Sequence, residues 1–171
     1  MFGRKSIYLA LIILALLALL LALSSTAFAK SYKFVAGTIQ IGKQGIFVSA
    51  PGNRVVSLEV SKVKPPIPPL GVTLRAPTIK LSFRDSRNRE VPAEGLVFIF
   101  FNLGPRERDL WDASGAKAVS IWVMNGSGIW KECPPMLIEA GDHGRLACLV
   151  SKNGTYGLGQ KSYDPESYTK P

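Results

Sequence analysis

The sequence predicts an all-β protein: an antiparallel two-sheet β-sandwich preceded by an N-terminal signal helix. Three observations support this fold class. Short runs of alternating apolar and polar residues recur along the chain after residue 30. Turn-forming residues separate these runs at intervals of roughly ten residues, which is typical of sandwich folds. Outside the N-terminal segment, no long stretch has the apolar periodicity of a helix.

Residues 1–29 have the features of a secretory signal peptide. Arg4 and Lys5 precede an unbroken apolar run at residues 7–23, and small residues follow as far as Ala29. Because this segment ends in an A-x-A pattern, we expect cleavage between Ala29 and Lys30. The alternative is an uncleaved N-terminal membrane anchor, although a helix of that run spans only about 25 Å of a hydrocarbon core ~30 Å thick. Either outcome exports the rest of the chain.

The composition limits what the exported part contains. The chain has 171 residues and a net charge of +9, so removing 29 residues with two positive charges leaves 142 residues and a charge of +7. This length suits one domain, which we place at residues 30–159, with a disordered tail at 160–171. One His and two Cys are too few for a zinc finger, and we expect no cofactor and no metal site.

The predicted strands differ in how clearly the sequence marks them. The clearest is Thr78–Arg84, where apolar and polar residues alternate strictly. Residues 54–60 repeat the pattern, with Val56, Leu58 and Val60 on one face. Gly95–Asn102 is apolar on both faces, which predicts a strand covered on both sides or one that needs protection from aggregation. Further strands are expected at residues 45–50, 117–124, 145–150 and 154–158, and residues 104–115 could hold one helical turn.

Several of these segments match a known pattern in the same order. They are VVSLEV at 55–60 followed by a proline-rich excursion, IKLSFRDSRNREV at 79–91, GLVFIFFNLGP at 95–105, VSIWVMNGSGIWKEC at 119–133 and GTYGLG at 154–159. The order resembles β-sandwich modules of many bacterial surface proteins, which are similar to the Zona-occludens/Unc-type domain. The resemblance covers roughly residues 37–159. It implies a non-catalytic surface or scaffolding module, with Trp130 on a core hairpin and Tyr156 on the closing strand.

The two cysteines are not part of that pattern. Cys133 ends the predicted Trp130 strand, and Cys148 lies within the predicted strand at 145–150. Because exported domains meet oxidising conditions, we expect a Cys133–Cys148 disulfide if the two strands are neighbours. Such a bridge would stabilise the fold by about 3 kcal/mol in the loop-entropy model. The alternative is two separate buried thiols.

The sequence holds no recognisable catalytic set. His143 lies in a predicted turn beside Asp142, no G-x-S-x-G motif is present, and no pair of carboxylates stands out. We therefore predict a non-enzymatic structural or interaction module, secreted or held at the cell surface. Its expected partner is an unidentified cell-envelope protein or polysaccharide. Nucleic acid is not expected, because acidic residues interrupt the basic ones and no aromatic residues alternate with them.

The alternative function is a carbohydrate-binding module that uses exposed aromatic residues. Its best candidate contact is Trp111, which is expected in a loop beside Asp109 and Asp112. The proline-rich segment at 62–69 is interpreted as a stiff excursion between strands. The Asn-Gly pairs at Asn125 and Asn153 are predicted turns, and both also match the glycosylation sequon.

Overall fold

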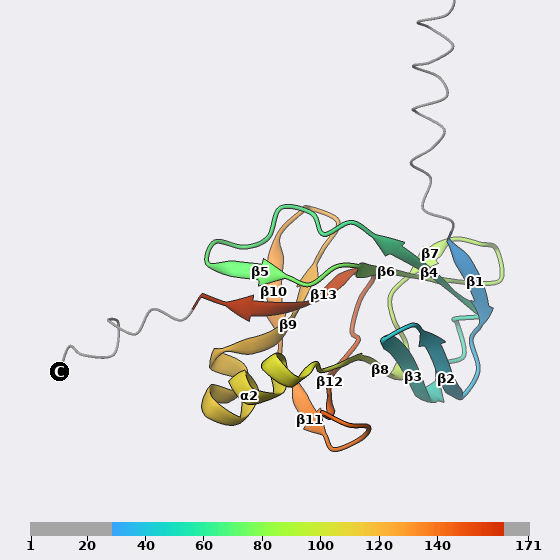
Figure 1. Ribbon diagram of the computed structural model, residues 1–171. Helices are drawn as coiled ribbons and strands as arrows, with labels where there is room; N and C mark the ends of the chain where they lie inside the picture. The colour runs from blue at the N-terminus through green and yellow to red at the C-terminus, as the bar shows by residue number, and fades with distance from the viewer. Residues whose placement is uncertain (1–28, 163–171) are drawn as a thin grey trace, which may run out of the picture.

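A computed structural model describes residues 29–162, which form two packed antiparallel sheets (Figure 1). This confirms the predicted fold class. Sheet A has the order β1-β4-β6-β13-β9-β10, with β5 paired to β13 and β7 paired to β6. Its strands are β1 (Lys30–Lys33), β4 (Ser57–Val63), β5 (Val72–Leu74), β6 (Thr78–Arg84), β7 (Glu90–Val91), β9 (Val119–Met124), β10 (Trp130–Cys133) and β13 (Gly154–Lys161).

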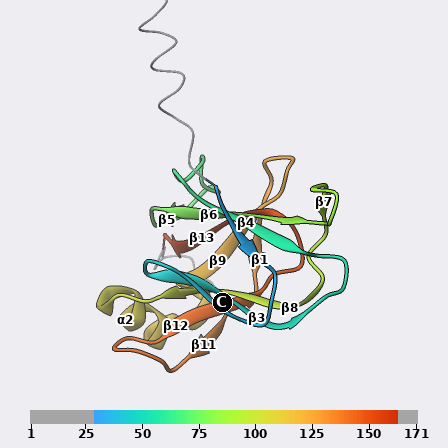
Figure 2. The same cartoon turned by 90° about the vertical axis from the view of Figure 1, so that its right-hand side faces the viewer.

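Sheet B has the order β11-β12-β8-β3-β2 and covers one face of sheet A. Its strands are β2 (Gly37–Ile41), β3 (Gln44–Pro51), β8 (Gly95–Asn102), β11 (Met136–Ile138) and β12 (Arg145–Leu149). Figure 2 shows the two layers edge-on, with β4, β5, β6 and β13 in the upper layer and β3, β8, β11 and β12 in the lower one. One helix, α2 (Pro105–Ser114), and a short 3-10 turn, η1 (Gly115–Lys117), connect β8 to β9 at one end of the sandwich.

The core lies between the two sheets and follows the predicted alternation. In β6, Ile79, Leu81 and Phe83 are fully buried, and Phe34 packs edge-on against Phe83 with ring centroids 5.7 Å apart. Tyr156 of β13 is also buried, and its hydroxyl donates a hydrogen bond to the Lys152 carbonyl. Burial of this kind supplies most of the stabilisation of a sandwich.

Some details of the predicted pattern are wrong. Leu58 and Val60 are buried as expected, but Val56 is exposed, because β4 begins only at Ser57 and Val55 takes the buried position. Trp130 lies half-buried on the outer face of sheet A rather than in the core. There it pairs across from Met124, and its indole N–H donates to the Ile67 carbonyl at 2.8 Å.

The helix is longer than the single turn expected. Pro105 occupies the first helical position, and Glu107 accepts a hydrogen bond from the Gly104 N–H at 2.6 Å. Gly115 ends the helix with a φ of 56°, which favours glycine. The helix is therefore defined by its end signals and not by an apolar stripe, which explains why periodicity did not reveal it.

The C-terminal boundary also lies further along than predicted. β13 continues through Lys161, where Gln160 and Lys161 pair with β5. Lys161 also forms an ion pair with Glu132 at 2.9 Å. The start of the predicted tail is thus part of sheet A. The rest of the tail and residues 1–28 lie outside the described residues.

Candidate functional site

An apolar groove of about 320 Å³ crosses the outer face of sheet B, and we call it the sheet B groove. All five strands of the sheet contribute to it. Its lining residues are Thr38, Phe47, Phe98, Phe100, Met136, Ile138, Arg145 and Ala147. They share this face because side chains alternate along each strand, so that in β8 Val97, Ile99 and Phe101 fill the core while Phe98 and Phe100 face outward.

A glycine shapes the floor of the groove. Gly45 of β3 lies directly across from Phe100 of β8. A Cβ at Gly45 would collide with the Phe100 ring, so the missing side chain lets that ring lie flat over β3. The guanidinium of Arg145 covers the same ring at 4.6 Å from its centroid. Phe100 is therefore only 3% exposed although it faces outward.

Arg145 is the one charged residue among those lining the groove. Its Nε is buried and has no hydrogen-bond partner among residues 29–162. A buried donor without a partner is costly, and a guanidinium favours a carboxylate as acceptor. The groove thus combines an apolar surface with a single cationic donor.

The exposed apolar surface extends beyond the groove. Five large apolar side chains on this face of sheet B are each 41–49% exposed: Phe47, Leu96, Met136, Ile138 and Leu149. Several partly exposed large apolar side chains on one sheet face are a common feature of protein interaction surfaces. The sequence signal for it was the apolar character of β8 on both faces. The groove residues on the other strands have no such signal in the local sequence.

The two predicted disulfide residues are joined. Cys133 and Cys148 form a disulfide with their Cα atoms 6.0 Å apart, and both are buried. The bridge does not link neighbouring strands of one sheet, because β10 belongs to sheet A and β12 to sheet B. It instead ties the two layers together. A disulfide is consistent with an oxidising, extracytoplasmic location.

Trp111 does not lie in a loop. It is part of α2, is partly buried, and packs together with Leu110 against the core. The helix forms here because Gly104, Pro105 and Glu107 start it, and this turns Trp111 toward the sandwich. The prediction of Trp111 as an exposed loop contact is therefore wrong.

The predicted cleavage residues lie at the start of the described chain. Ala29 is exposed and immediately precedes β1, and Lys30 is the first residue of that strand. Cleavage between them would leave every strand intact. The predicted signal peptide itself lies outside the described residues.

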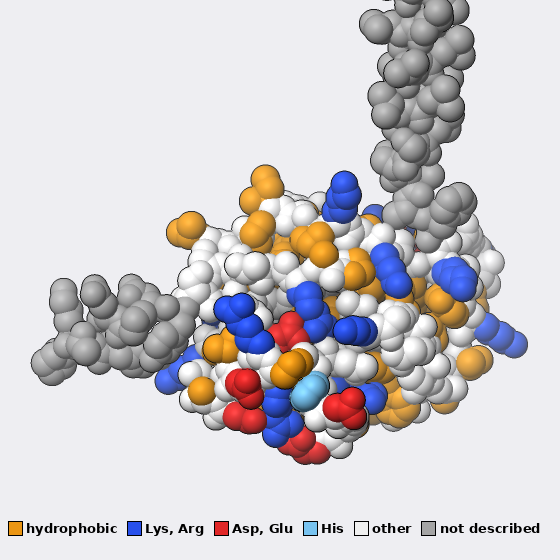
Figure 3. Space-filling view, in the orientation of Figure 1, with side chains coloured by type: hydrophobic (Ala, Val, Ile, Leu, Met, Phe, Trp, Pro, Cys, Tyr) orange, Lys and Arg blue, Asp and Glu red, His pale blue; other side chains and the backbone are white. Residues whose placement is uncertain are grey.

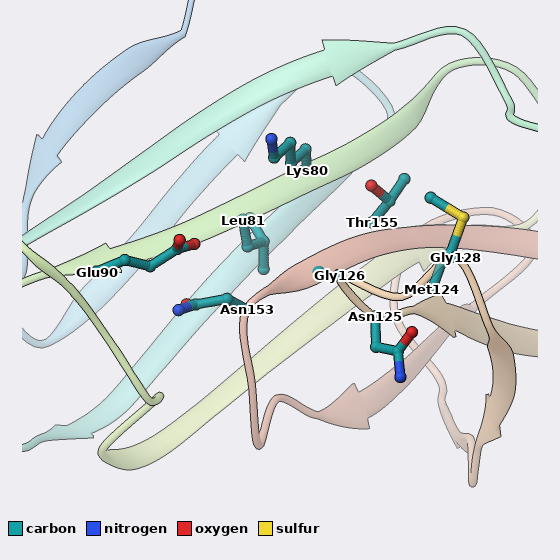
Figure 4. Close-up of a pocket in the computed structure, with 10 residues that line it drawn as sticks. Lys80, Leu81, Glu90, Met124, Asn125, Gly126, Gly128, Asn153 and Thr155 are labelled. Carbon is teal, nitrogen blue, oxygen red and sulfur yellow. The ribbon is translucent and has the colours of Figure 1, made fainter.

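A polar hollow of about 350 Å³ lies beside β6, β7 and β13 (Figure 4). Lys80 and Glu90 border it from neighbouring strands, and Asn125 and Asn153 line it from two turns. Both asparagines bond to backbone. Asn153 accepts from the Phe83 N–H at 2.9 Å and donates to the Val91 carbonyl at 2.8 Å. The oxygen of Asn125 accepts from the Ser127 and Ile129 N–H groups.

The two asparagines predict different responses to the same substitution. Asn153→Asp keeps the acceptor for Phe83 but loses the donor to Val91 and places a carboxylate against that carbonyl. We expect a loss of about 1–2 kcal/mol in the free energy of unfolding, measured by urea denaturation. Asn125→Asp is the matched control and should change stability little, since its oxygen alone is used in those bonds. Equal losses in both variants would contradict this assignment.

His143 and Asp142 line another hollow, of about 430 Å³, at the start of α2. Its lining residues include Lys43 but no serine, threonine or cysteine. Within residues 29–162, no group of three or more His, Cys, Asp or Glu side chains is placed to hold a metal ion. In the same part of the chain, no helix is long and apolar enough to cross a membrane.

Comparison with known proteins adds no assignment. No protein-family model matches the sequence, and no curated protein matches it significantly. The resemblance to the Zona-occludens/Unc-type module remains a prediction.

Proposed function

We propose that the protein is an exported, non-catalytic interaction module that binds an apolar segment of a cell-envelope protein in the sheet B groove. The observation that carries this proposal is the apolar outer face of sheet B, where phenylalanine, leucine, isoleucine and methionine side chains are partly exposed. When a partner covers exposed apolar side chains, the removal of apolar surface from water makes binding more favourable. The disulfide is consistent with the proposed location outside the cytoplasm.

The lining of the groove favours a partner segment of a particular chemistry. Phe47, Met136 and Ile138 offer flexible and flat apolar contacts that suit aliphatic or aromatic side chains. The Arg145 guanidinium lines the groove, and guanidinium groups favour carboxylates as acceptors. The partner segment is therefore apolar and carries one acidic group that reaches Arg145.

Selection from a random peptide library tests this proposal. We expect the wild-type protein to select apolar peptides that carry a carboxylate. Phe47→Asp/Ile138→Asp should weaken the binding of those peptides at least about tenfold, because both substitutions place charge in the apolar contact. Arg145→Gln should still select apolar peptides but should no longer prefer peptides that carry a carboxylate. Affinities are measured by calorimetry.

The control variant is Val35→Asp/Val56→Asp, which adds the same two charges at exposed apolar residues outside the groove. It should bind the selected peptides like the wild type. Peptide binding that the groove substitutions leave unchanged would contradict the proposal. Analytical sedimentation of the free protein tests whether a second copy of this chain occupies the groove instead. A wild-type dimer that becomes a monomer in Phe47→Asp/Ile138→Asp would show that the occupant is a second copy and would contradict the partner protein proposed here.

The carbohydrate-binding alternative stays a prediction with a direct test. A titration with polysaccharides, followed by tryptophan fluorescence, would favour it if a saturable response appeared. Because Trp111 packs against the core, the Trp111→Ala variant needs a parallel stability measurement to separate lost binding from lost folding.

A further inference from the structure

A hollow of about 250 Å³ opens between the two sheets at one side of the sandwich, and we call it the inter-sheet hollow. Its lining residues are Lys30 and Tyr32 of β1, Ile41 of β2, and Val60 and Lys62 of β4. β1 is an edge strand of sheet A and β2 is an edge strand of sheet B, so within residues 29–162 no further strand closes this side. The hollow shares no lining residue with the sheet B groove and is a separate site.

The strand register turns both lysines of the hollow toward the inner face of sheet A. Leu58 and Val60 of β4 fill the core, and Lys62 follows two residues later on the same face. Lys30 lies directly across from Val60 in the β1–β4 pair, and directly opposed residues share a face of the sheet. The Lys62 ammonium lies beside Gly42 of the β2–β3 turn, where a Cβ would be 3.5 Å from its Nζ atom. Two cationic side chains therefore border the gap between the sheets.

Neither of these lysines has an anionic partner in the part of the chain that the structure describes. The ion pairs among residues 29–162 involve other cations. The acidic residue of β4, Glu59, faces the other side of the sheet and pairs with Arg84 at 2.9 Å. On the face drawn in Figure 3, the right-hand end, where Figure 1 draws β1, carries basic and apolar side chains, and the acidic ones gather lower. An anion bound between the two ammonium groups would relieve their mutual repulsion.

The rest of the lining is apolar. Ile41 and Val60 are buried, and the partly buried Tyr32 packs against the core. A short acyl chain would cover these side chains, while its head group reaches the ammonium groups at the rim. The volume of the hollow lies below the roughly 300 Å³ at which sites for drug-sized ligands begin, so the ligand that fits is small.

We propose that the inter-sheet hollow binds a small aliphatic carboxylate, with its head group at Lys30 and Lys62 and its acyl chain over Ile41 and Val60. The ligand bridges the edge strand of sheet A and the β2–β3 turn of sheet B. Because it binds the folded chain, it also stabilises the fold in proportion to its concentration. This site is independent of the sheet B groove and of the partner proposed there.

Titration of the purified protein with octanoate, followed by methyl and backbone chemical shifts, tests the inter-sheet hollow. We expect saturable changes at Ile41 and Val60. Octanol lacks the charge and acetate lacks the chain, so each should bind at least about tenfold more weakly than octanoate. Added salt should weaken the binding of octanoate, because the lysines are exposed. Octanol or acetate that binds as tightly as octanoate would overturn the proposal.

Replacement of single lysines tests the role of the charge. Lys62→Met keeps most of the apolar stem and removes the ammonium, so it should weaken octanoate binding at least about tenfold and leave octanol binding unchanged. Lys30→Met should weaken octanoate binding in the same direction. The matched control is Lys64→Met, since Lys64 is exposed and does not line the hollow, and it should bind octanoate like the wild type. Urea denaturation of all three variants checks that each one folds.

Three results would contradict a carboxylate site between the sheets. The first is no saturable binding of octanoate by the wild type, which would leave the inward-facing lysines only the role of protecting the sheet edge from other strands. The second is an equal loss of affinity in Lys62→Met and Lys64→Met. The third is a set of shift changes at Ile138 with none at Ile41, which would place octanoate in the sheet B groove instead.

Discussion

Replacing both cysteines by alanine is expected to lower the free energy of unfolding by about 3 kcal/mol. The Cys133–Cys148 bridge closes a loop with a sequence separation of 15, and the loop-entropy model assigns about that value to such a closure. The bridge also joins the two sheets, so the loss affects their packing as well as the unfolded chain. Urea denaturation of Cys133→Ala/Cys148→Ala against the oxidised wild type measures the difference.

Thiol labelling provides the control for this prediction. Oxidised wild-type protein, denatured without reductant, should not react with an alkylating reagent, whereas the reduced protein should react at both cysteines. The single variant Cys148→Ala should leave Cys133 reactive and lose stability to a similar extent. A double variant as stable as the oxidised wild type would contradict a stabilising role for the bridge.

The second large effect is expected at Glu107, the buried carboxylate at the start of α2. One of its oxygens accepts from the Gly104 N–H at 2.6 Å and from Arg75 at 2.7 Å. Arg75 also donates to the Asn102 carbonyl, so this group joins the end of β8, the β5–β6 connection and the helix. Glu107→Ala removes a helix cap and leaves Arg75 without its ion-pair partner. We expect the free energy of unfolding to fall by about 2–3 kcal/mol. The loss stays below that of a fully buried ion pair because Arg75 is only partly buried.

Two further variants separate the roles of Glu107. Glu107→Gln keeps an oxygen for Gly104 and should lose only part of the stability. Glu139→Ala removes an exposed carboxylate that pairs with Arg108, and it should cost less than about 1 kcal/mol. Thermal denaturation followed by circular dichroism compares all three variants. Equal losses of stability in Glu107→Ala and Glu139→Ala would contradict the claim that the buried carboxylate contributes more than the exposed one.

Strands with a strict alternation were predictable from local sequence. The range of β6 matches the predicted one, because its alternating apolar residues Ile79, Leu81 and Phe83 point into the core. The range of β8 also matches, although this segment is apolar on both faces, because a run rich in aromatic and β-branched residues favours a strand. The helix is longer than the single turn predicted, because half of its residues are charged and its limits depend on its end residues. The signals for it, Gly104, Pro105, Glu107 and Gly115, were present in the sequence.

The arrangement in space was less predictable. The cysteine pairing was expected, but β10 pairs with β9 in sheet A and β12 pairs with β8 in sheet B, so the bridge lies between sheets rather than within one. The sheet B groove unites Phe47, Phe98 and Arg145, which are far apart in the sequence. Only the order of strands brings them together, and a single sequence does not encode that order locally.

The central claim is that the sheet B groove is the binding surface of this module. Mapping of backbone and methyl chemical shifts, while the protein is titrated with a selected peptide, tests the claim most directly. We predict that the largest changes cluster at Phe47, Phe98, Met136, Ile138 and Arg145, and that they disappear in Phe47→Asp/Ile138→Asp. Changes that cluster instead on the polar hollow or around His143, with the groove unaffected, would contradict the claim.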